Sequence, residues 1–407
     1  MTTFEELGVS SKIVESLTNM NFVSPTGIQT ETIPYVLSGI DILAQAQTGS
    51  GKTGAFGIPI VDTVRKTEEL QSLILAPTRE LAQQVGEQLR LMSRVKGLKV
   101  SIIFGGTSIE RQIQDLKKRP QIIVGTPGRV IDHINRKTIR LETLTHLVLD
   151  EADEMLNMGF IEDVRFILSK ITSRHQTLLF SATMPKEIKE LANELLHDPV
   201  DIRVAPPASP AETITQYLIY CEKADKKRVL KDMLVSPEVT KAIIFTRTKI
   251  GADRLTKKLI EDGIKVLTIH GDKTQGQRQN ALQRFRTNQV DVLVATDVAA
   301  RGIDISDISH VFNYDLPEED ESYIHRIGRA GRAGKEGISI SLCCHEELGL
   351  LASIEKMLKK EIPLMKTEYS IELKRKKASD SKSNRRPLFR KKSDSRSGSD
   401  RNKKRDS

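Results

Sequence analysis

Two short segments of the sequence combine residue types that suit phosphate and metal chemistry. The first, AQTGSGKT at 46–53, follows a strand-like run and fits the phosphate-loop pattern G-x-x-x-x-G-K-[S/T], with Ala46 at the first glycine position. Glycines let backbone N–H groups approach phosphate oxygens, Lys52 adds a positive charge and Thr53 offers a hydroxyl to Mg²⁺. The segment therefore predicts a nucleotide-phosphate site; the alternative is a glycine-rich turn that caps a helix. The remaining residues of the predicted cradle are Gln47, Thr48, Gly49, Ser50 and Gly51.

The second segment, HLVLDEADEM at 146–155, ends a short apolar run in a group of carboxylates. Leu147–Leu149 predicts a buried strand, which would fix the position of Asp150. A phosphate loop requires a carboxylate near Mg²⁺, so we assign Asp150 to the metal through water and Glu151 to activation of the attacking water. Taken alone, the patch would fit a solvated helix start. Because a phosphate loop is present, the catalytic interpretation is favoured, and we expect Glu154 to lie on the helix surface.

Both segments belong to a regular alternation of short β-branched runs with longer helical patterns. Continuous apolar strands with helices between them are typical of parallel sheets covered on both faces. A Pro-rich break at 203–213 divides the runs into two sets, so we predict an α/β fold with two domains in tandem. The runs are 41–46, 72–76, 100–104, 121–125, 146–150, 177–181, 242–246, 266–270, 291–296, 310–314 and 337–342.

The composition fits this interpretation. Aromatic residues make up only 4% of the 407 residues and Trp is absent, while 29% are charged, which is typical of a soluble α/β protein. The longest apolar runs, such as 292–295, are far shorter than the roughly 20 residues of a membrane-spanning helix. The three cysteines, Cys221, Cys343 and Cys344, form no metal-ligand pattern and predict buried thiols in a reducing compartment. We expect a cytoplasmic protein without a membrane partner.

The net charge of +9 has an uneven distribution. Residues 372–407 hold 15 Lys and Arg against 5 Asp and Glu, which leaves 48 basic and 49 acidic residues in the rest of the chain. A folded region that binds a polyanion must therefore use a local patch. The basic segment has little to bury, so we expect a disordered tail that binds polyanions non-specifically or only aids solubility.

The motifs together resemble those of the DEAD-box family of ATP-dependent RNA helicases. The resemblance begins with DEAD itself at 150–153 and the phosphate loop, and it continues in order from about Phe4 to Gly337. It implies two RecA-like domains, each a mostly parallel sheet with helices on both faces. It also implies ATP and Mg²⁺ as cofactors and RNA as the partner.

Near the N-terminus, NFVSPTGIQ at 21–29 resembles the family's adenine-reading element. The resemblance implies that Gln29 bonds the adenine edge and that Phe4 packs against the base. Asn21 stands where the family usually has Gly, which suggests an altered turn. The alternative is that Gln29 caps a helix and Phe22 belongs to the core.

Several loops match the family's RNA-contacting motifs, in which hydroxyls, arginines and glycine N–H groups grip the sugar-phosphate backbone without reading sequence. In the first domain these residues are Pro77, Thr78, Arg79, Gly105, Gly106, Thr126, Pro127, Gly128 and Arg129. In the second domain they are Gln275, Arg278 and Thr296. Lys273 departs from the family, which has an apolar residue there.

The second domain carries no phosphate loop but has the arginine-rich motif HRIGRAGR at 325–332. The resemblance assigns Asp304 to the nucleotide ribose, and Arg329 and Arg332 to arginine fingers that stabilise transition-state charge. If the helix continues, His325, Arg329 and Arg332 share one face. An arginine-rich domain facing a phosphate-loop domain indicates one active site divided between the two. The alternative is a solvated arginine-rich helix end. For coupling between domains the family implies Asp153, Ser181, Thr183 and His325.

We therefore predict an ATP-hydrolysing RNA helicase that closes on RNA and unwinds short duplexes locally. The alternatives are an ATP-gated RNA clamp or scaffold, and a DNA-acting motor with the same core. The absence of further folded domains resembles bacterial members, which suggests a monomer working in ribosomal or RNA-decay assemblies. The predicted organisation is an adenine-recognition element at 1–30, an ATP-binding domain at 31–203, a linker at 204–213, a helicase domain at 214–366 and a basic tail at 367–407.

Overall fold

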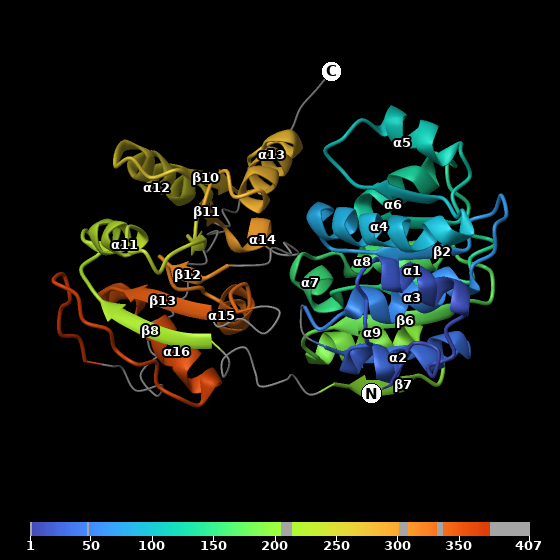
Figure 1. Ribbon diagram of the computed structural model, residues 1–407, viewed down its shortest axis with the longest axis horizontal. Coiled ribbons are helices and arrows are strands. Elements are labelled where there is room, and N and C mark those ends of the chain that lie inside the picture. Colours follow the sequence, from blue (N-terminus) through green and yellow to red (C-terminus); the bar gives the residue numbers. More distant parts are fainter. Residues whose placement is uncertain (1, 47–48, 205–213, 301–307, 332–336, 375–407) are drawn as a thin grey trace, which may run out of the picture.

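The computed structural model describes residues 2–46, 49–204, 214–300, 308–331 and 337–374, which form two separate sheets with their helices (Figure 1). The predictions for Gln47, Thr48, Asp304 and Arg332 lie outside the described residues. So do most of the predicted linker and the tail beyond residue 374.

The first sheet has seven parallel strands in the order β3-β4-β2-β5-β6-β1-β7. Parallel strands need crossover connections, and here helices supply them on both faces of the sheet (Figure 1). The strands are β1 (Ile42–Gln45), β2 (Ser72–Leu75), β3 (Val100–Ile103), β4 (Ile122–Gly125), β5 (His146–Leu149), β6 (Gln176–Ser181) and β7 (Val200–Arg203). The helices are α1 (Ser11–Asn19), α2 (Gly27–Leu37), α3 (Lys52–Thr63), α4 (Arg79–Ser93), η1 (Arg94–Lys96), α5 (Ile109–Leu116), α6 (Pro127–Asn135), α7 (Ala152–Asn157), α8 (Ile161–Leu168) and α9 (Lys186–Leu195).

The second sheet has six parallel strands in the order β10-β11-β9-β12-β13-β8. The strands are β8 (Ile214–Tyr220), β9 (Ala242–Phe245), β10 (Val266–Ile269), β11 (Val292–Ala295), β12 (His310–Asn313) and β13 (Gly337–Cys343). The helices are α11 (Lys226–Leu234), α12 (Lys249–Glu261), α13 (Gln275–Arg286), α14 (Asp297–Ala300), α15 (Asp320–Ile327), η3 (His345–Glu347) and α16 (Leu348–Leu358). The predicted fold class is confirmed.

Alternate residues along the strands build separate cores on the two faces of each sheet. In the first sheet, Ile74 and Val148 join the cluster beneath α3 and α4, while Leu75 and Leu149 join the cluster beneath α8 and α9. Both faces are therefore buried, which explains why these strands appear in the sequence as continuous apolar runs. The three cysteines are free and buried, as predicted.

Two strands, β7 and β8, are absent from the predicted runs. Each lies at the edge of its sheet and pairs with one neighbour only, β1 for β7 and β13 for β8. In β7 only Ile202 is buried, and β8 begins with alternating buried and partly exposed positions. Polar residues interrupt the apolar run in both strands, so a search for continuous apolar runs misses them.

Polar caps at the carboxyl ends of the strands start the helices that carry the motifs. The Thr78 hydroxyl accepts a hydrogen bond from Leu81 N at the start of α4, and Thr274 and Gln277 form a capping box at the start of α13. Pro127 occupies the first turn of α6, where its missing N–H costs nothing. Within the described ranges, no helix is both long and apolar enough to span a membrane.

Candidate nucleotide and RNA site

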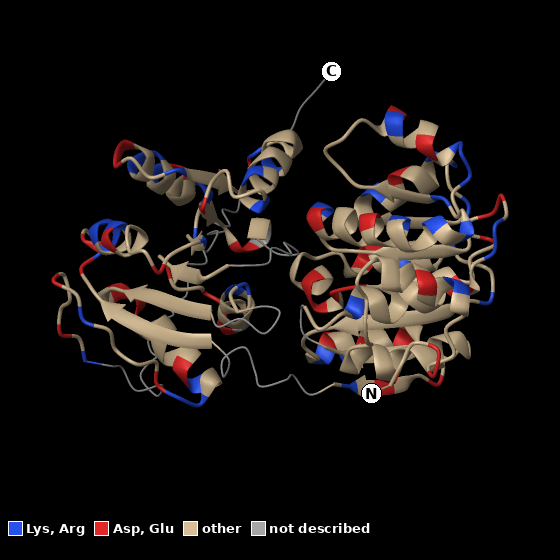
Figure 2. Cartoon of the chain, viewed as in Figure 1, with Lys and Arg blue, Asp and Glu red and all other residues tan. Residues whose placement is uncertain are grey.

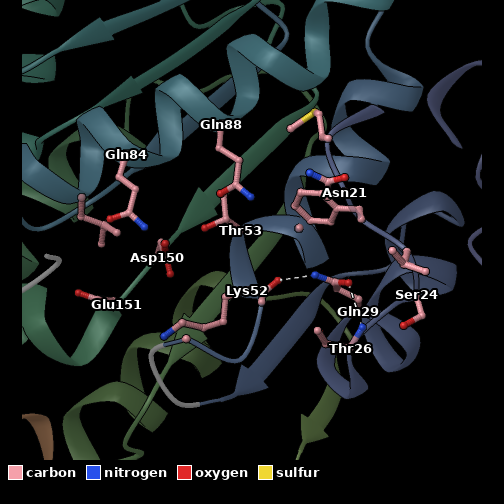
Figure 3. A pocket seen from close by; sticks show the side chains of 17 residues that line it. Asn21, Ser24, Thr26, Gln29, Lys52, Thr53, Gln84, Gln88, Asp150 and Glu151 are labelled. Atoms are coloured by element: carbon pink, nitrogen blue, oxygen red, sulfur yellow. Dashed lines mark hydrogen bonds between the residues drawn. The ribbon is translucent and has the colours of Figure 1, made fainter. Parts of the chain in front are cut away.

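The phosphate loop lies between β1 and α3 and borders a cavity of about 500 Å³, a size that suits a nucleotide (Figure 3). Lys52 is the first residue of α3, whose N-terminus points positive charge into the loop. Gly51 has φ +97°, and a side chain there would meet Thr26 and Gln29. Gly54 has equally little room, because a Cβ would lie 2.4 Å from Gln29 Nε2. The cavity is lined by Met20, Asn21, Phe22, Val23, Ser24, Thr26, Gln29, Gly49, Gly51, Lys52, Thr53, Gly54, Leu81, Gln84, Gln88, Asp150 and Glu151.

Gln29 connects α2 to the phosphate loop. Its Oε1 accepts a hydrogen bond from Thr26 N at 3.0 Å, and its Nε2 donates to Gly51 O at 3.1 Å. Gln29 thus caps a helix, as the alternative interpretation held. Since a side-chain amide has two donor hydrogens and two acceptor lone pairs, one of each is still available to a base.

Among the described residues, Phe22 is the aromatic residue that lines the cavity. Phe4 is 3% exposed and lies in the hydrophobic core. The structure therefore does not bring Phe4 to the cavity. Asn21 adopts φ +61°, the left-handed conformation that Asn tolerates better than most residues. We expected Asn21, in place of the family's Gly, to alter this turn. Asn21 instead adopts the left-handed backbone conformation that Gly favours.

The acidic segment reaches the cavity from the carboxyl end of β5. Asp150 is 2% exposed, and among the described residues its Oδ1 has no hydrogen-bond partner; the same is true of the buried Lys52 Nζ. Burial raises the pKa of Asp150 to about 7, and nearby Lys52 acts in the opposite direction. An unpartnered carboxylate oxygen facing an unpartnered ammonium suits a phosphate with its cation. The donor set fits Mg²⁺ held by Asp150 through water and by the Thr53 hydroxyl.

Glu151 lies beside Asp150 and is 5% exposed. It precedes α7 with φ +54°, a backbone conformation that is uncommon for Glu. Figure 3 shows Asp150 and Glu151 toward one end of the cavity and Gln29, Thr26 and Asn21 toward the other. The carboxylates are thus placed to act on phosphate groups, and the amides to contact a base.

The burial of Asp150 has a measurable cost in the nucleotide-free protein. Because its folded-state pKa is raised above 3.8, the carboxyl group destabilises the fold progressively between pH 4 and about pH 7. Asp150→Asn cannot ionise, so we expect it to be more stable than the natural protein by on the order of 2 kcal/mol at pH 8. Thermal unfolding in EDTA at pH 5 and pH 8 should show the gap widening with pH. A gap that does not change with pH would contradict this account.

Asp153 turns away from the cavity and bonds the segment that follows β6. Its Oδ2 accepts hydrogen bonds from Thr183 N at 2.8 Å, Thr183 Oγ1 at 3.0 Å and Ala182 N at 3.1 Å. The Ser181 hydroxyl donates to Thr183 O and accepts from Asp153 N. The contact between Asp153 and Ser181–Thr183 is confirmed, and their role in coupling stays a prediction.

The second domain presents α15 to the first. Helix α15 ends at Ile327, so Arg329 lies beyond it and the condition for a helical face shared with His325 is not met. A glycine at position 328, which is unfavourable within a helix, follows its last residue. Arg329 still lines a small cavity together with His325 and Arg326, and its Nε donates to His325 O at 3.2 Å.

Glu154 corrects a second expectation, because it is only 3% exposed and not on the helix surface. Its Oε1 lies 3.1 Å from Nδ1 of His325 in the other domain. Arg326 holds this part of α15 in place through Asp297, with its Nη2 donating at 2.8 Å, and through the carbonyl of Asp315. The sequence did not reveal these contacts of Glu154 and Arg326, because His325 and Asp297, their partners, lie far from them in the chain.

The RNA-type motifs gather at the carboxyl edges of the two sheets. The Arg79 guanidinium lies over Gly105 and Gly106, where a Cβ on Gly106 would approach its Nη1 to 2.1 Å. Pro77 and Thr78 are buried next to β2, and Thr126 to Arg129 form the start of α6. In the second domain, Thr296 follows β11 and is 8% exposed.

Contacts between the domains involve several of these residues. Arg79 Nη1 donates to Gln275 Oε1 at 3.4 Å, and Arg278 forms a 2.9 Å ion pair with Glu80 of the first domain. Gln275 Nε2 also donates to Glu80 at 3.3 Å. Glu80 is a bridging residue that the motif assignment did not include. Figure 2 shows acidic and basic residues interspersed over both domains, so any grip on a polyanion depends on such local groups.

The fold and the site define a two-domain enzyme with one phosphate-loop domain and one arginine-rich domain. Residues 26–191 match the DEAD/DEAH box helicase model, and residues 225–334 match the helicase conserved C-terminal domain. The chain is 50% identical over 368 residues to the DEAD-box ATP-dependent RNA helicase CshA of Bacillus cereus, covering 90% of this chain and 70% of the relative. The chain belongs to the DEAD-box family of ATP-dependent RNA helicases, and it is therefore an RNA helicase with ATPase activity.

Two solved structures differ in how well the whole chain superposes on them. S. cerevisiae Dbp5 bound to RNA and ADP BeF3 is 31% identical with a TM-score of 0.81, covering 90% of this chain and 96% of that one. A DEAD box protein from the hyperthermophile Methanococcus jannaschii is 41% identical with a TM-score of 0.54, covering 90% and 99%. The second structure therefore has the more similar sequence and the lower TM-score.

Proposed function

We propose that the two domains close around RNA when ATP binds, and that hydrolysis in the cleft between them releases the RNA. The observation that carries this proposal is the set of direct contacts between the domains, above all His325 with Glu154 and Arg278 with Glu80. The likeness in domain arrangement to the relative bound to RNA and ADP BeF3 supports it. Since both halves of the site belong to one chain, we propose a monomer.

In this mechanism the first domain binds the nucleotide. Lys52 and the loop N–H groups hold the phosphates, and Gln29 contacts the base. Mg²⁺, held by Thr53 and through water by Asp150, would offset the charge on the phosphates. Glu151 accepts the proton of the attacking water. ADP and phosphate no longer favour the closed arrangement, so the domains separate.

The second domain completes this site on closure. His325 meets Glu154 only when α15 approaches α7, and the same approach carries Arg329 toward the nucleotide. Because Arg329 reaches the nucleotide only when the two domains are closed, hydrolysis depends on the closed state, which is also the state that binds RNA. Asp153, which bonds Ser181–Thr183, lies one residue from Glu154 and links the carboxylate segment to this interface.

RNA would run along the carboxyl edges of both sheets, where Arg79, Gly105, Gly106 and Thr126 lie in the first domain. Such groups grip the sugar-phosphate backbone and read no base sequence. A backbone grip that closes and opens once per ATP separates a short duplex locally, without translocation along it.

Strand displacement tests the proposal directly. We expect single-stranded RNA to stimulate ATP hydrolysis, and the DNA of the same sequence to stimulate it far less. We also expect ATP-dependent separation of a short RNA duplex but not of a duplex several times longer. Equal stimulation by DNA would favour the DNA-motor alternative. Stable RNA binding in the presence of ATP with no strand displacement would favour the clamp.

A further inference from the structure

A buried polar cluster lies directly beneath two of the RNA-facing loops in the first domain. It consists of Gln112 on α5 and of Arg129 and His133 on α6. Gln112 is 6% exposed and His133 is fully buried. Neither residue belongs to the motifs that carry the family resemblance, and the proposed mechanism does not use them.

Gln112 is bonded on both sides of its amide group. Its Nε2 donates to Phe104 O at 2.9 Å and to Thr107 Oγ1 at 2.7 Å, which holds the loop that contains Gly105 and Gly106. The carbonyl of Phe104 can only accept, so the amide nitrogen must face this loop. The Oε1 atom therefore faces α6, where Arg129 Nη1 donates to it at 2.9 Å. Both donor hydrogens of the amide are thus used, and one lone pair of Oε1 remains for a second donor.

His133 supplies the second donor to that oxygen. Its Nε2 lies 3.1 Å from Gln112 Oε1, and its Nδ1 lies 2.7 Å from Thr138 Oγ1. Burial, with the positive charge of Arg129, lowers the pKa of His133 to about 4. The ring is neutral at physiological pH, and because Gln112 Oε1 can only accept, the ring proton must be on Nε2.

Arg129 is largely occupied within the protein. Besides Gln112, its Nη1 donates to Thr107 O at 3.3 Å, and its Nε lies 3.4 Å from the Asp132 carboxylate. Its side chain is only 11% exposed. The guanidinium fork thus ties the glycine loop to the start of α6, which leaves little of it to face a phosphate.

We infer that Gln112 and His133 are positioning residues for RNA binding, acting through Arg129 and the loop at 104–107. The inference rests on the proposed function, which places RNA on these loops. The cluster keeps the backbone N–H groups of Gly105, Gly106 and the first turn of α6 in one fixed arrangement. Arg129 then contributes through the geometry of its planar fork more than through its charge.

The test uses the full chain with ADP–beryllium fluoride and fluorescein-labelled oligouridylate RNA, with the dissociation constant measured by anisotropy. We expect Gln112→Met and Arg129→Met each to weaken RNA binding on the order of tenfold, because each leaves buried polar groups unpaired. The double variant should be no weaker than either single variant, as for residues that act as one unit. Arg129→Lys, which keeps the charge but not the fork, should be as weak as Arg129→Met.

Gln114→Met is the matched control, since Gln114 is exposed on the same helix and should bind RNA normally. His133→Leu provides a second variant with a smaller loss in the same direction, should Gln112→Met fold poorly. Thermal unfolding and affinity for a fluorescent ATP analogue report folding of the first domain. In ATPase assays the RNA concentration for half-maximal stimulation should rise, with the rate at saturating RNA retained.

Different results would contradict the positioning role of Gln112 and His133 and the proposed function. RNA binding lost in Arg129→Met but retained in Gln112→Met, His133→Leu and Arg129→Lys would overturn the inference and make Arg129 a direct phosphate ligand. RNA binding retained in every variant, including Arg79→Ala, would mean that RNA does not lie on these loops, and the proposed function would fail at that point.

Discussion

Replacing Glu151 by Gln is expected to slow ATP hydrolysis by roughly 10²- to 10⁴-fold, the usual contribution of a general base. Glu151 is buried at the end of the cavity beside Asp150 and is one of the residues that line it. Gln has the same shape and hydrogen-bonding reach but cannot accept the proton of the attacking water. Binding of ATP and RNA should persist, and the closed complex should be longer-lived than in the natural protein.

Single-turnover hydrolysis of radiolabelled ATP with saturating RNA measures this effect apart from binding. Glu162→Gln is a suitable control, since Glu162 lies on the surface of the neighbouring helix α8 and pairs only with Arg165 among the described contacts. If Glu151→Gln turned over ATP at the natural rate, another group would have to be the base. Loss of ATP binding would instead assign Glu151 to the nucleotide pocket itself.

Removing the Arg329 side chain is expected to lower RNA-stimulated hydrolysis by about 10³-fold, as for other arginines that complete a phosphoryl-transfer site. Arg329 lies in the second domain, whereas the nucleotide cavity is lined by residues of the first. Arg329→Ala should therefore leave ATP affinity in the open state almost unchanged and act on the rate. This split between rate and affinity is the signature of a group that acts in the transition state.

Arg254→Ala is the matched control, because Arg254 is an exposed arginine on α12 of the same domain. The measurements are the steady-state rate at saturating RNA and the affinity for a fluorescent ATP analogue. A modest rate loss accompanied by weaker RNA binding would show that Arg329 supports closure without acting on the phosphate. We expect Arg332→Ala to have the same effect as Arg329→Ala.

Much of the site could be predicted because its signals are local in the sequence. The phosphate loop, the strand that ends in Asp150, and the glycines that contact Arg79 each lie within a few residues of their own element. Parallel sheets bring the carboxyl ends of strands to one edge. Once the loops that follow the strands are identified in the sequence, their common edge of the sheet gives the location of the site.

What could not be predicted depends on partners brought together by the fold. Glu154 looks like any acidic residue in a first helical turn, until α15 of the other domain places His325 against it. Gln112 looks like an ordinary helix residue, yet its amide is enclosed by the loop at 104–107 and by α6. The spacing of His325 and Arg329 left open where their helix ends, and the structure ends α15 at Ile327.

The position of β1 in its sheet has a consequence for how the first domain folds during its synthesis on the ribosome. The strand that leads into the phosphate loop pairs with β6 and β7, which begin at Gln176 and Val200. At a synthesis rate of roughly 5–20 residues per second, β1 waits on the order of ten seconds for its neighbours to emerge. Until then its backbone edges are unpaired, and the nascent chain cannot yet bind ATP. A nucleotide would stabilise the first domain only after almost all of it has been made, and it cannot guide the earlier steps of folding.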